Sequence, residues 1–205
     1  MKLKVIDING KDTGRQVDLP KEFFAVEPND HAIYLDVKQY LANQRQATHK
    51  AKERADIKGS TKKLRKQKGA GAARIGSVKS PLLRGGGRAF GPRSDRNYGF
   101  KLNKKLKSVA RKSALTYRAN AKEIIVVEDF KFETPKTKEF VSALNNIAAN
   151  EKVVYVSAEI DSNLYLASKN VQTAKVTEIN KLNTYDILNC KKLIFAESTL
   201  EYFKS

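Results

Sequence analysis

The first 44 residues begin with an alternation of apolar and polar positions that predicts two short strands. Apolar side chains recur at every second position through most of residues 2–8, which is the period of a strand with one buried face. The dipeptide Asn9-Gly10 is a common turn sequence, and residues 16–19 can return as the second strand. The N-terminus therefore predicts a β-hairpin rather than a signal peptide.

Two helices are predicted from apolar residues at helical spacing. The first runs from Asp30, whose carboxylate can cap free amide groups, to beyond Gln44, and its apolar face is Ile33, Val37, Tyr40 and Leu41. The second begins near Asn103, with an apolar face of Leu106, Val109, Ala110, Ser113, Ala114 and Tyr117 and a basic face of Lys104, Lys107, Arg111 and Arg118. We expect the apolar face to pack on the domain and the basic face to meet phosphate.

The last third of the chain alternates between strand and helix patterns. Apolar runs or alternating patterns predict strands at residues 123–128, 152–157, 174–179 and 192–196. Helical patterns lie between them at 136–150, 162–169 and 184–188, the first after a capping sequence, Thr134-Pro135. Such alternation predicts crossover connections and a mainly parallel sheet. The predicted fold class is α/β, a three-layer domain with a mainly parallel sheet flanked by helices, plus a long irregular basic extension inserted after the first helix.

Residues 45–107 lack this periodicity and carry almost all of the net charge. Twenty of these 63 residues are Lys or Arg and three are acidic, so the stretch holds +17 of the chain's +18. Nine of the 11 glycines lie here too. A segment this charged buries too little apolar surface to offset the entropy of ordering it. We therefore expect a globular domain, residues 1–44 with 108–205, and an extended loop, residues 45–107, with two arms and a tip that a strongly negative partner orders.

The sequence contains little that suggests catalysis, metal binding or a membrane. The two histidines are far apart, no Cys/His cluster has metal-ligand spacing, and no apolar run approaches the roughly 18 residues of a membrane helix. The single cysteine, Cys190, is expected to pack beside a strand. Glu128-Asp129 follows a strand, where α/β enzymes often carry their sites, but no glycine-rich turn comes next. We expect no enzyme activity and no cofactor, apart from Mg²⁺ ions held by RNA. The alternative from a different class of function is an α/β enzyme that uses Glu128.

The extension is better suited to RNA than to any other partner. Its Lys and Arg side chains can neutralise phosphates and release counterions, and its glycines let backbone amides approach phosphate oxygens. Phe90, Tyr98 and Phe100 are interleaved with the charges and can stack on unpaired bases. A reader of duplex DNA normally presents a periodic helix or ribbon, whereas a long aperiodic arm suits irregular RNA helices. A free regulator that binds mRNA or DNA stays an alternative interpretation, because the same positive charge would let such a protein bind nucleic acid.

A set of short motifs follows in order through nearly the whole chain: Gln67-Lys68-Gly69, Gly71, Arg74, Gly76-Ser77, Ser80-Pro81, Gly85-Gly86-Gly87, Phe90-Gly91-Pro92, Tyr98, Asn103-Lys104-Lys105, Ser113-Ala114-Leu115, Ile125-Val126-Val127 and Pro135-Lys136-Thr137-Lys138. In this order they resemble the bacterial form of the large-subunit ribosomal protein four family, the universal proteins of the peptide exit tunnel. The ordered set, rather than any one motif, makes the resemblance specific.

The resemblance implies a structural protein of the large ribosomal subunit, in the cytoplasm, that binds rRNA early in assembly. Its extension would thread through rRNA to the nascent-peptide tunnel and form a constriction with a second ribosomal protein, number twenty-two. The positions implied to bind rRNA are Arg45, Lys62, Lys63, Arg65, Lys66, Arg74, Lys79, Arg84, Arg88, Arg93, Arg96, Tyr98, Lys101, Lys104 and Lys105. Those implied at the tunnel-facing tip are Lys66, Gln67, Lys68, Gly69, Ala70, Gly71, Ala72 and Ala73.

The chain departs from the family pattern around the tip. Leu64-Arg65 stands where bacterial relatives commonly have Pro-Trp, and Ala70 and Ala72 stand where they commonly have Thr and Arg. These differences put in question an aromatic stack and one tunnel-facing charge of the family. Lys68 is then the basic side chain expected to meet the tunnel.

Overall fold

The computed structural model describes residues 2–149 and 151–203, and the chain divides into two compact units. The first unit comprises Met1–Leu41 with Lys101–Ser205, and the second comprises Ala42–Phe100. The strands and helices that the structure describes lie in the first unit, except for the last two residues of one helix. Within the described ranges, no helix is long and apolar enough to cross a membrane.

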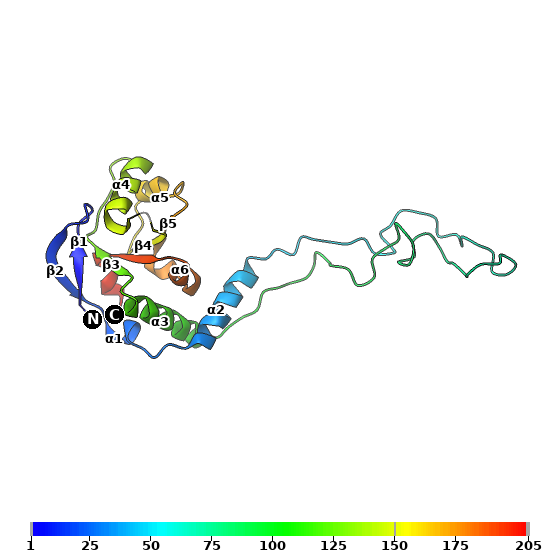
Figure 1. Cartoon of the computed structure of the whole chain (residues 1–205), viewed down its shortest axis with the longest axis horizontal. Helices are drawn as coiled ribbons and strands as arrows, with labels where there is room; N and C mark the ends of the chain where they lie inside the picture. The colour runs from blue at the N-terminus through cyan, green and yellow to red at the C-terminus, as the bar shows by residue number, and fades with distance from the viewer. Residues whose placement is uncertain (1, 150, 204–205) are drawn as a thin grey trace. The chain divides into compact units, whose positions relative to one another are not determined.

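A twisted sheet forms the middle of the first unit (Figure 1). Its strands, within the described residues, are β1 (Lys2–Ile6), β2 (Asp12–Asp18), β3 (Ile124–Val127), β4 (Val153–Ser157), β5 (Ala174–Glu178) and β6 (Lys192–Ala196). Their order is β2-β1-β3-β6-β4-β5, in which β1 and β2 are antiparallel and the remaining neighbours are parallel. The predicted α/β class, the N-terminal hairpin and the mainly parallel sheet are confirmed.

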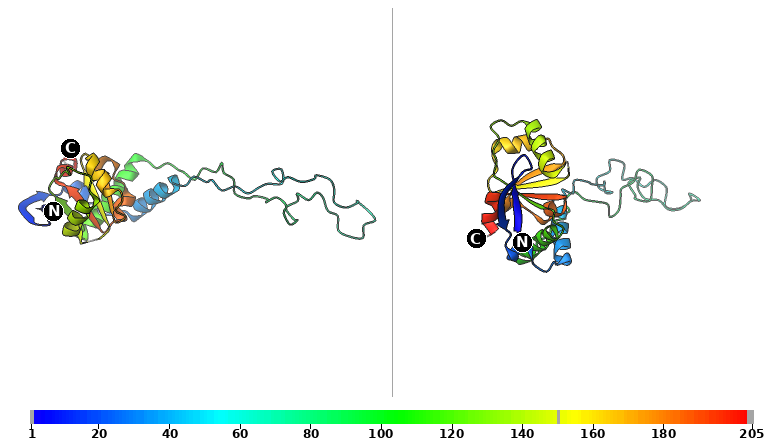
Figure 2. Two further views of the ribbon diagram at one scale, coloured as in Figure 1. Left: turned by 90° about the horizontal axis from the view of Figure 1, so that it is seen from above. Right: turned by 60° about the vertical axis from the view of Figure 1, so that its left-hand side comes forward.

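Helices cover both faces of the sheet and complete three layers (Figures 1 and 2). One face packs against α1 (Lys21–Phe24), α3 (Lys104–Asn120), α6 (Thr184–Leu188) and the 3₁₀ segments η1 (Ile179–Lys181) and η2 (Glu197–Phe203). The other face packs against α4 (Thr137–Ala148) and α5 (Ser162–Ser168). A further helix, α2 (Asp30–Asn43), contacts α6, where the rings of Tyr40 and Tyr185 stack 4.9 Å apart.

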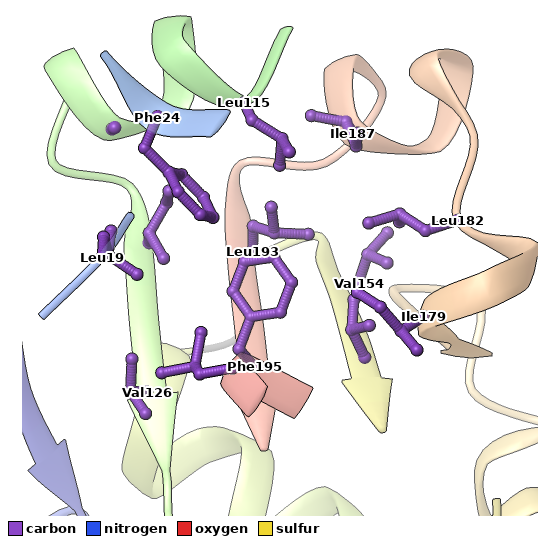
Figure 3. Close-up of a cluster of buried hydrophobic side chains, with 14 of the residues drawn as sticks. Leu19, Phe24, Leu115, Val126, Val154, Ile179, Leu182, Ile187, Leu193 and Phe195 are labelled. Atoms are coloured by element: carbon purple, nitrogen blue, oxygen red, sulfur yellow. The ribbon is translucent and has the colours of Figure 1, made fainter. Parts of the chain in front are cut away.

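The central strands bury side chains on both faces. In β6, Leu193 and Phe195 belong to the cluster beneath α1 and α3, whereas Ile194 and Ala196 belong to the cluster beneath α4 and α5. All four side chains are fully buried. Figure 3 shows Leu193 and Phe195 between the sheet and the helices of the first cluster. Because helices cover both faces, a continuous apolar run can form a strand without alternating with polar residues.

Several predicted boundaries are wrong. The four-residue helix α1 was not predicted, because so short a segment shows no helical period. The irregular extension therefore follows the second helix of the chain rather than the first. That helix, α2, ends at Asn43 and does not continue past Gln44. Helix α4 begins at Thr137 with Lys136 at its N-cap, because Thr134 instead closes a tight turn in which its carbonyl accepts the Lys136 N–H at 2.8 Å.

The cap of α2 also differs from the prediction. Asn29, rather than Asp30, caps the helix: its Oδ1 accepts the N–H of Ala32 at 2.9 Å. Asp30 accepts a hydrogen bond from the Tyr117 hydroxyl of α3 at 2.6 Å. The carboxylate therefore connects two helices instead of ending one.

Helices α2 and α3 do not bury the full apolar stripes that were predicted. Leu41 of α2 is 44% exposed, whereas the polar Gln39 is 4% exposed. In α3, Val109 and Tyr117 are each 40% exposed, and the helix buries Leu115, Thr116 and Ala119 in addition to the predicted Ala110, Ser113 and Ala114. The backbone N–H groups of Val26 and Asn29 donate to the hydroxyls of Thr116 and Ser113. The segment between α1 and α2 therefore covers a side of α3 that the spacing of apolar residues does not reveal.

Arg118, predicted on the basic face of α3, instead joins α3 to α6. Its Nε donates to the carbonyl of Ile187 at 2.9 Å and its Nη2 to that of Leu188 at 2.8 Å, while Nη1 pairs with Glu123. The side chain is 15% exposed. The guanidinium thus satisfies carbonyls at the C-terminal end of α6, where intrahelical donors are missing.

We expect Arg118→Met to lower the free energy of unfolding by about 2–4 kcal/mol. The substitution keeps much of the side-chain length but leaves two partly buried carbonyls and the Glu123 carboxylate without their donor. Urea denaturation followed by circular dichroism measures the change. The matched control is Arg111→Met on the same helix, where the side chain is exposed and a change within about 0.5 kcal/mol is expected. Equal effects of the two substitutions would contradict the assignment.

Candidate nucleic-acid interface

The second unit is built from two arms that run side by side. Backbone hydrogen bonds join Ala51 N to Pro92 O at 2.9 Å, Arg88 N to Lys52 O at 2.9 Å and Leu64 N to Gly76 O at 3.1 Å. Later residues of the outgoing arm thus pair with earlier residues of the returning arm. Figure 2 shows this antiparallel course, in cyan and green, without helix or strand. We define the outgoing arm as residues 45–64, the tip as 65–75 and the returning arm as 76–98.

Two glycines of the returning arm lie against other backbone atoms, Gly86 within its own arm and Gly87 against the outgoing arm. A Cβ atom on Gly86 would lie 1.8 Å from the Ser80 carbonyl oxygen, and one on Gly87 would lie 2.4 Å from the Arg54 nitrogen. Both distances are far inside van der Waals contact with backbone atoms that cannot simply turn away. The sequence suggested that glycines here admit phosphate, whereas Gly87 is required by the packing of the two arms and Gly86 by a tight turn within the returning arm.

The second unit carries a large uncompensated positive charge. Residues 42–100 include 16 Lys or Arg and three acidic residues, a net charge of +13. Two of those acidic residues are neutralised locally: Glu53 pairs with Arg93 at 2.6 Å and Asp56 with Lys50 at 3.5 Å. Like charges on adjacent arms repel one another, so an anionic partner would stabilise the paired arrangement.

The positions predicted to bind rRNA are mostly open to solvent. Lys79 and Tyr98 are partly buried, and the other predicted positions are exposed, as is every residue of the tunnel-facing set 66–73. At the tip, Gly69 and Gly71 have φ angles of +80° and +62°, which glycine adopts without strain. The exposure agrees with a binding role, but the assignment of individual residues stays a prediction.

The three aromatic residues of the extension have different surroundings. The guanidinium carbon of Arg45 lies 3.8 Å from the ring centre of Tyr98, and that of Arg96 lies 4.8 Å away. Cations therefore already stack on Tyr98. Phe100 is partly buried, whereas Phe90 is 105% exposed. Phe90 is thus the one of these three that presents its whole ring to a partner.

The first unit also carries basic residues, which line a groove along α3. Its volume is about 440 Å³, its rim includes Lys104, Lys107, Arg111 and Lys112, and its wall includes Phe23. The Lys112 ammonium lies 4.6 Å from the centre of the Phe23 ring. Three members of the predicted basic face meet here. The prediction missed Lys112, although its spacing of eight residues from Lys104 was a signal that it shares this side of the helix.

The carboxylates after β3 have structural partners. Glu128 pairs with Arg15 at 2.7 Å, and Asp129 accepts the Ser198 hydroxyl at 2.8 Å. The adjacent hollow contains Tyr155, where burial, and to a smaller degree the charge of Asp129, raises the pKa of the phenol. In the part of the chain that the structure describes, no group of three or more His, Cys, Asp or Glu could hold a metal ion. Nothing in this arrangement favours the enzyme alternative.

Cys190 packs as the sequence predicted. The side chain is 3% exposed, and its thiol donates to the Ile187 carbonyl at 3.2 Å. Burial raises the pKa of the thiol, which disfavours the reactive thiolate.

Comparison with known families decides the identity. The sequence profile of the Ribosomal protein L4/L1 family matches residues 17–205. The chain belongs to this family. Three similar relatives of the L4/L1 family each carry the name large ribosomal subunit protein uL4.

The similarity to these relatives extends over the whole chain. The protein from Christiangramia forsetii is 58% identical over 206 residues, which cover 100% of this chain and 99% of the relative. That from Flavobacterium johnsoniae is 56% identical over 202 residues, covering 98% and 96%. That from Porphyromonas gingivalis is 54% identical over 210 residues, covering 100% of both. The family resemblance inferred from the short motifs is confirmed.

Proposed function

We propose that the chain is a primary rRNA-binding protein of the large ribosomal subunit, whose extension threads through the rRNA early in subunit assembly. Its family makes it a structural ribosomal protein rather than an enzyme, and in bacteria its place is the cytoplasmic ribosome. The observation that carries the RNA-binding role is the net charge of +13 on the two paired arms of residues 42–100.

The arms are suited to a polyanion with an irregular surface. Each phosphate that a Lys or Arg neutralises adds about 0.7–0.9 to the dependence of log K on log salt concentration. If half of the 16 basic residues of the second unit contact phosphate, that slope is about 6–7. The absence of a periodic helix in residues 44–100 supports rRNA over duplex DNA, because groove readers normally present a regular element.

The tip is assigned to the wall of the peptide exit tunnel. Residues 66–73 are exposed, and Ala70, Ala72 and Ala73 make them narrow. Lys68 is the basic side chain that meets the tunnel and the nascent peptide. Ribosomal protein twenty-two is the partner on the other side of the constriction. This part of the proposal rests on the family and on the exposure of the tip.

The proposal predicts that the protein sediments only with the large subunit when a cell lysate is fractionated on a high-salt gradient. Arms enclosed by folded rRNA are held sterically as well as by charge, so screening by salt does not release them. Immunodetection across the gradient measures the distribution. Release at moderate salt, or recovery at the top of the gradient, would favour a free binder of mRNA or DNA.

The large-subunit fraction of the same gradient also tests the tip. A photo-crosslinking amino acid replaces Lys68, and the matched control replaces Lys169, which is exposed on the first unit. Stalled nascent peptide should crosslink to position 68 and not to position 169. Equal labelling at both positions, or labelling at 169 alone, would contradict the tunnel assignment.

A further inference from the structure

One exposed aromatic ring in the extension has a backbone and surroundings typical of a ligand site. We propose that Phe90 stacks on a single unpaired nucleobase of RNA, and that Arg54 and Arg88 bind the phosphates next to that base. The inference rests on the proposed rRNA-binding function and deepens it by naming the site and its ligand.

The ring of Phe90 contributes nothing to the packing of the chain. It is 105% exposed, although the next residue, Gly91, lies so close to the outgoing arm that a Cβ atom on it would be 2.7 Å from the Cβ of Ala51. A large apolar side chain gains its usual stabilisation only when it leaves water. An aromatic ring left wholly in water therefore points to a partner that covers it.

The backbone holds this ring in an unusual conformation. Phe90 has a φ angle of +52°, a left-handed conformation that is rare for a bulky residue. The turn is fastened on both sides to the outgoing arm, by the Arg88 N–H donating to Lys52 and the Ala51 N–H donating to Pro92. Such strain persists where the surrounding structure enforces it, and it is concentrated at functional sites. A ring on a braced turn loses little freedom when it binds.

The hollow beside the ring has the charge that a nucleotide requires. It has a volume of about 530 Å³ and is lined by Arg54, Arg88 and Arg93 together with Glu53. Glu53 pairs with Arg93 at 2.6 Å, so that cation is compensated. Arg54 approaches the Ser77 hydroxyl at 3.4 Å, a neutral partner that leaves its charge in place. Arg54 and Arg88 are therefore the two cations that phosphates can meet.

A flat ring that lines the same hollow as two uncompensated arginines favours an unpaired base over an apolar pocket of a protein. Base–aromatic stacking needs a free ring face, and guanidinium groups bind the adjacent phosphates by paired hydrogen bonds. A protein pocket that received the ring would have to desolvate the same arginines without neutralising them. Tyr98 is unsuited to the role, since arginines already stack on it.

The test uses the full-length chain and transcribed large-subunit rRNA as the probe. We expect Phe90→Leu to weaken binding by about 5-fold to 150-fold, the range of lost base stacking, and Phe90→Trp to stay within about threefold of the wild type. The slope of log K against log salt should not change for Phe90→Leu, because no phosphate contact is removed. For Arg88→Gln the slope should fall by about 0.7–0.9.

Leu82→Ala is the matched control, because Leu82 is an apolar residue of the returning arm that is 94% exposed and has no ring. Its binding should stay within about twofold of the wild type. Phe90→Leu binding as tightly as the wild type, or Leu82→Ala weakening binding equally, would overturn the stacking site. The stacking site would also be overturned if a photo-crosslinking amino acid at position 90 left rRNA affinity unchanged and crosslinked to a ribosomal protein. Failure of the wild type itself to bind rRNA with a steep salt dependence would instead overturn the proposed function.

Discussion

Removal of residues 46–97, with a four-residue Gly/Ser linker in their place, is expected to abolish tight rRNA binding and to leave a folded α/β domain. The deleted segment contains 15 of the chain's 40 Lys and Arg residues, and losing this many cations should weaken binding by about 10³-fold or more near physiological salt. The buried clusters of the described residues contain no side chain from it. The linker can close the gap, because the Arg45 guanidinium already contacts the Tyr98 ring.

Two measurements check this excision. Filter binding to transcribed large-subunit rRNA gives the affinity, and thermal unfolding by circular dichroism gives the cooperativity of the domain. The matched control keeps the full-length extension with the same 15 basic residues replaced by Gln, which separates the effect of charge from that of length. Loss of the cooperative transition in the excised protein would show that the extension contributes to the core. Undiminished binding by either variant would contradict the role of the charge.

The largest loss of stability is expected from Phe195→Ala. The side chain is fully buried on β6, and its ring packs edge-on against Phe24 at 6.2 Å and Phe203 at 5.8 Å between centroids. The substitution leaves a cavity at the centre of the cluster shown in Figure 3. We expect the free energy of unfolding to fall by about 3–5 kcal/mol, a large part of the 5–15 kcal/mol typical of a domain.

Urea denaturation of the free protein measures this effect, and two variants serve as controls. Leu166→Ala removes an apolar side chain that is 54% exposed on α5, so its cost should be much smaller. Phe195→Leu keeps much of the buried volume and should give an intermediate loss. Phe195→Ala costing no more than Leu166→Ala would mean that this cluster does not carry the stability of the fold.

Long elements were predictable because their patterns repeat. The runs that became β3, β4 and β6 are apolar over four residues, the β5 run alternates apolar with polar residues, and the hairpin has both its alternation and its turn at Asn9-Gly10. The division between a near-neutral domain and a basic extension is equally a property of composition. Single capping residues were less predictable, because Asn29 and Asp30 are both chemically able to cap and only their contacts distinguish them.

The candidate RNA interface was predictable as a region and less so by residue. Charge density alone indicated the extension, and exposure agrees with that indication at nearly all the predicted positions. Charge density did not distinguish Arg118, which bonds to carbonyls of α6, from Arg111 about two helical turns earlier, which lines the basic groove. The two residues have the same chemistry, and their roles differ through neighbours that are far away in sequence.

By itself, the sequence determined the class of fold and predicted where a basic, aperiodic extension lies, because periodicity and net charge are properties of the chain alone. The tertiary structure decided which faces of α2 and α3 are buried, which glycines let the arms approach and which aromatic ring stays open. Those outcomes depend on contacts between residues far apart in the chain, such as Asn29 with Ser113 or Arg54 with Gly87. Local patterns cannot encode such contacts, since each depends on how the whole unit packs.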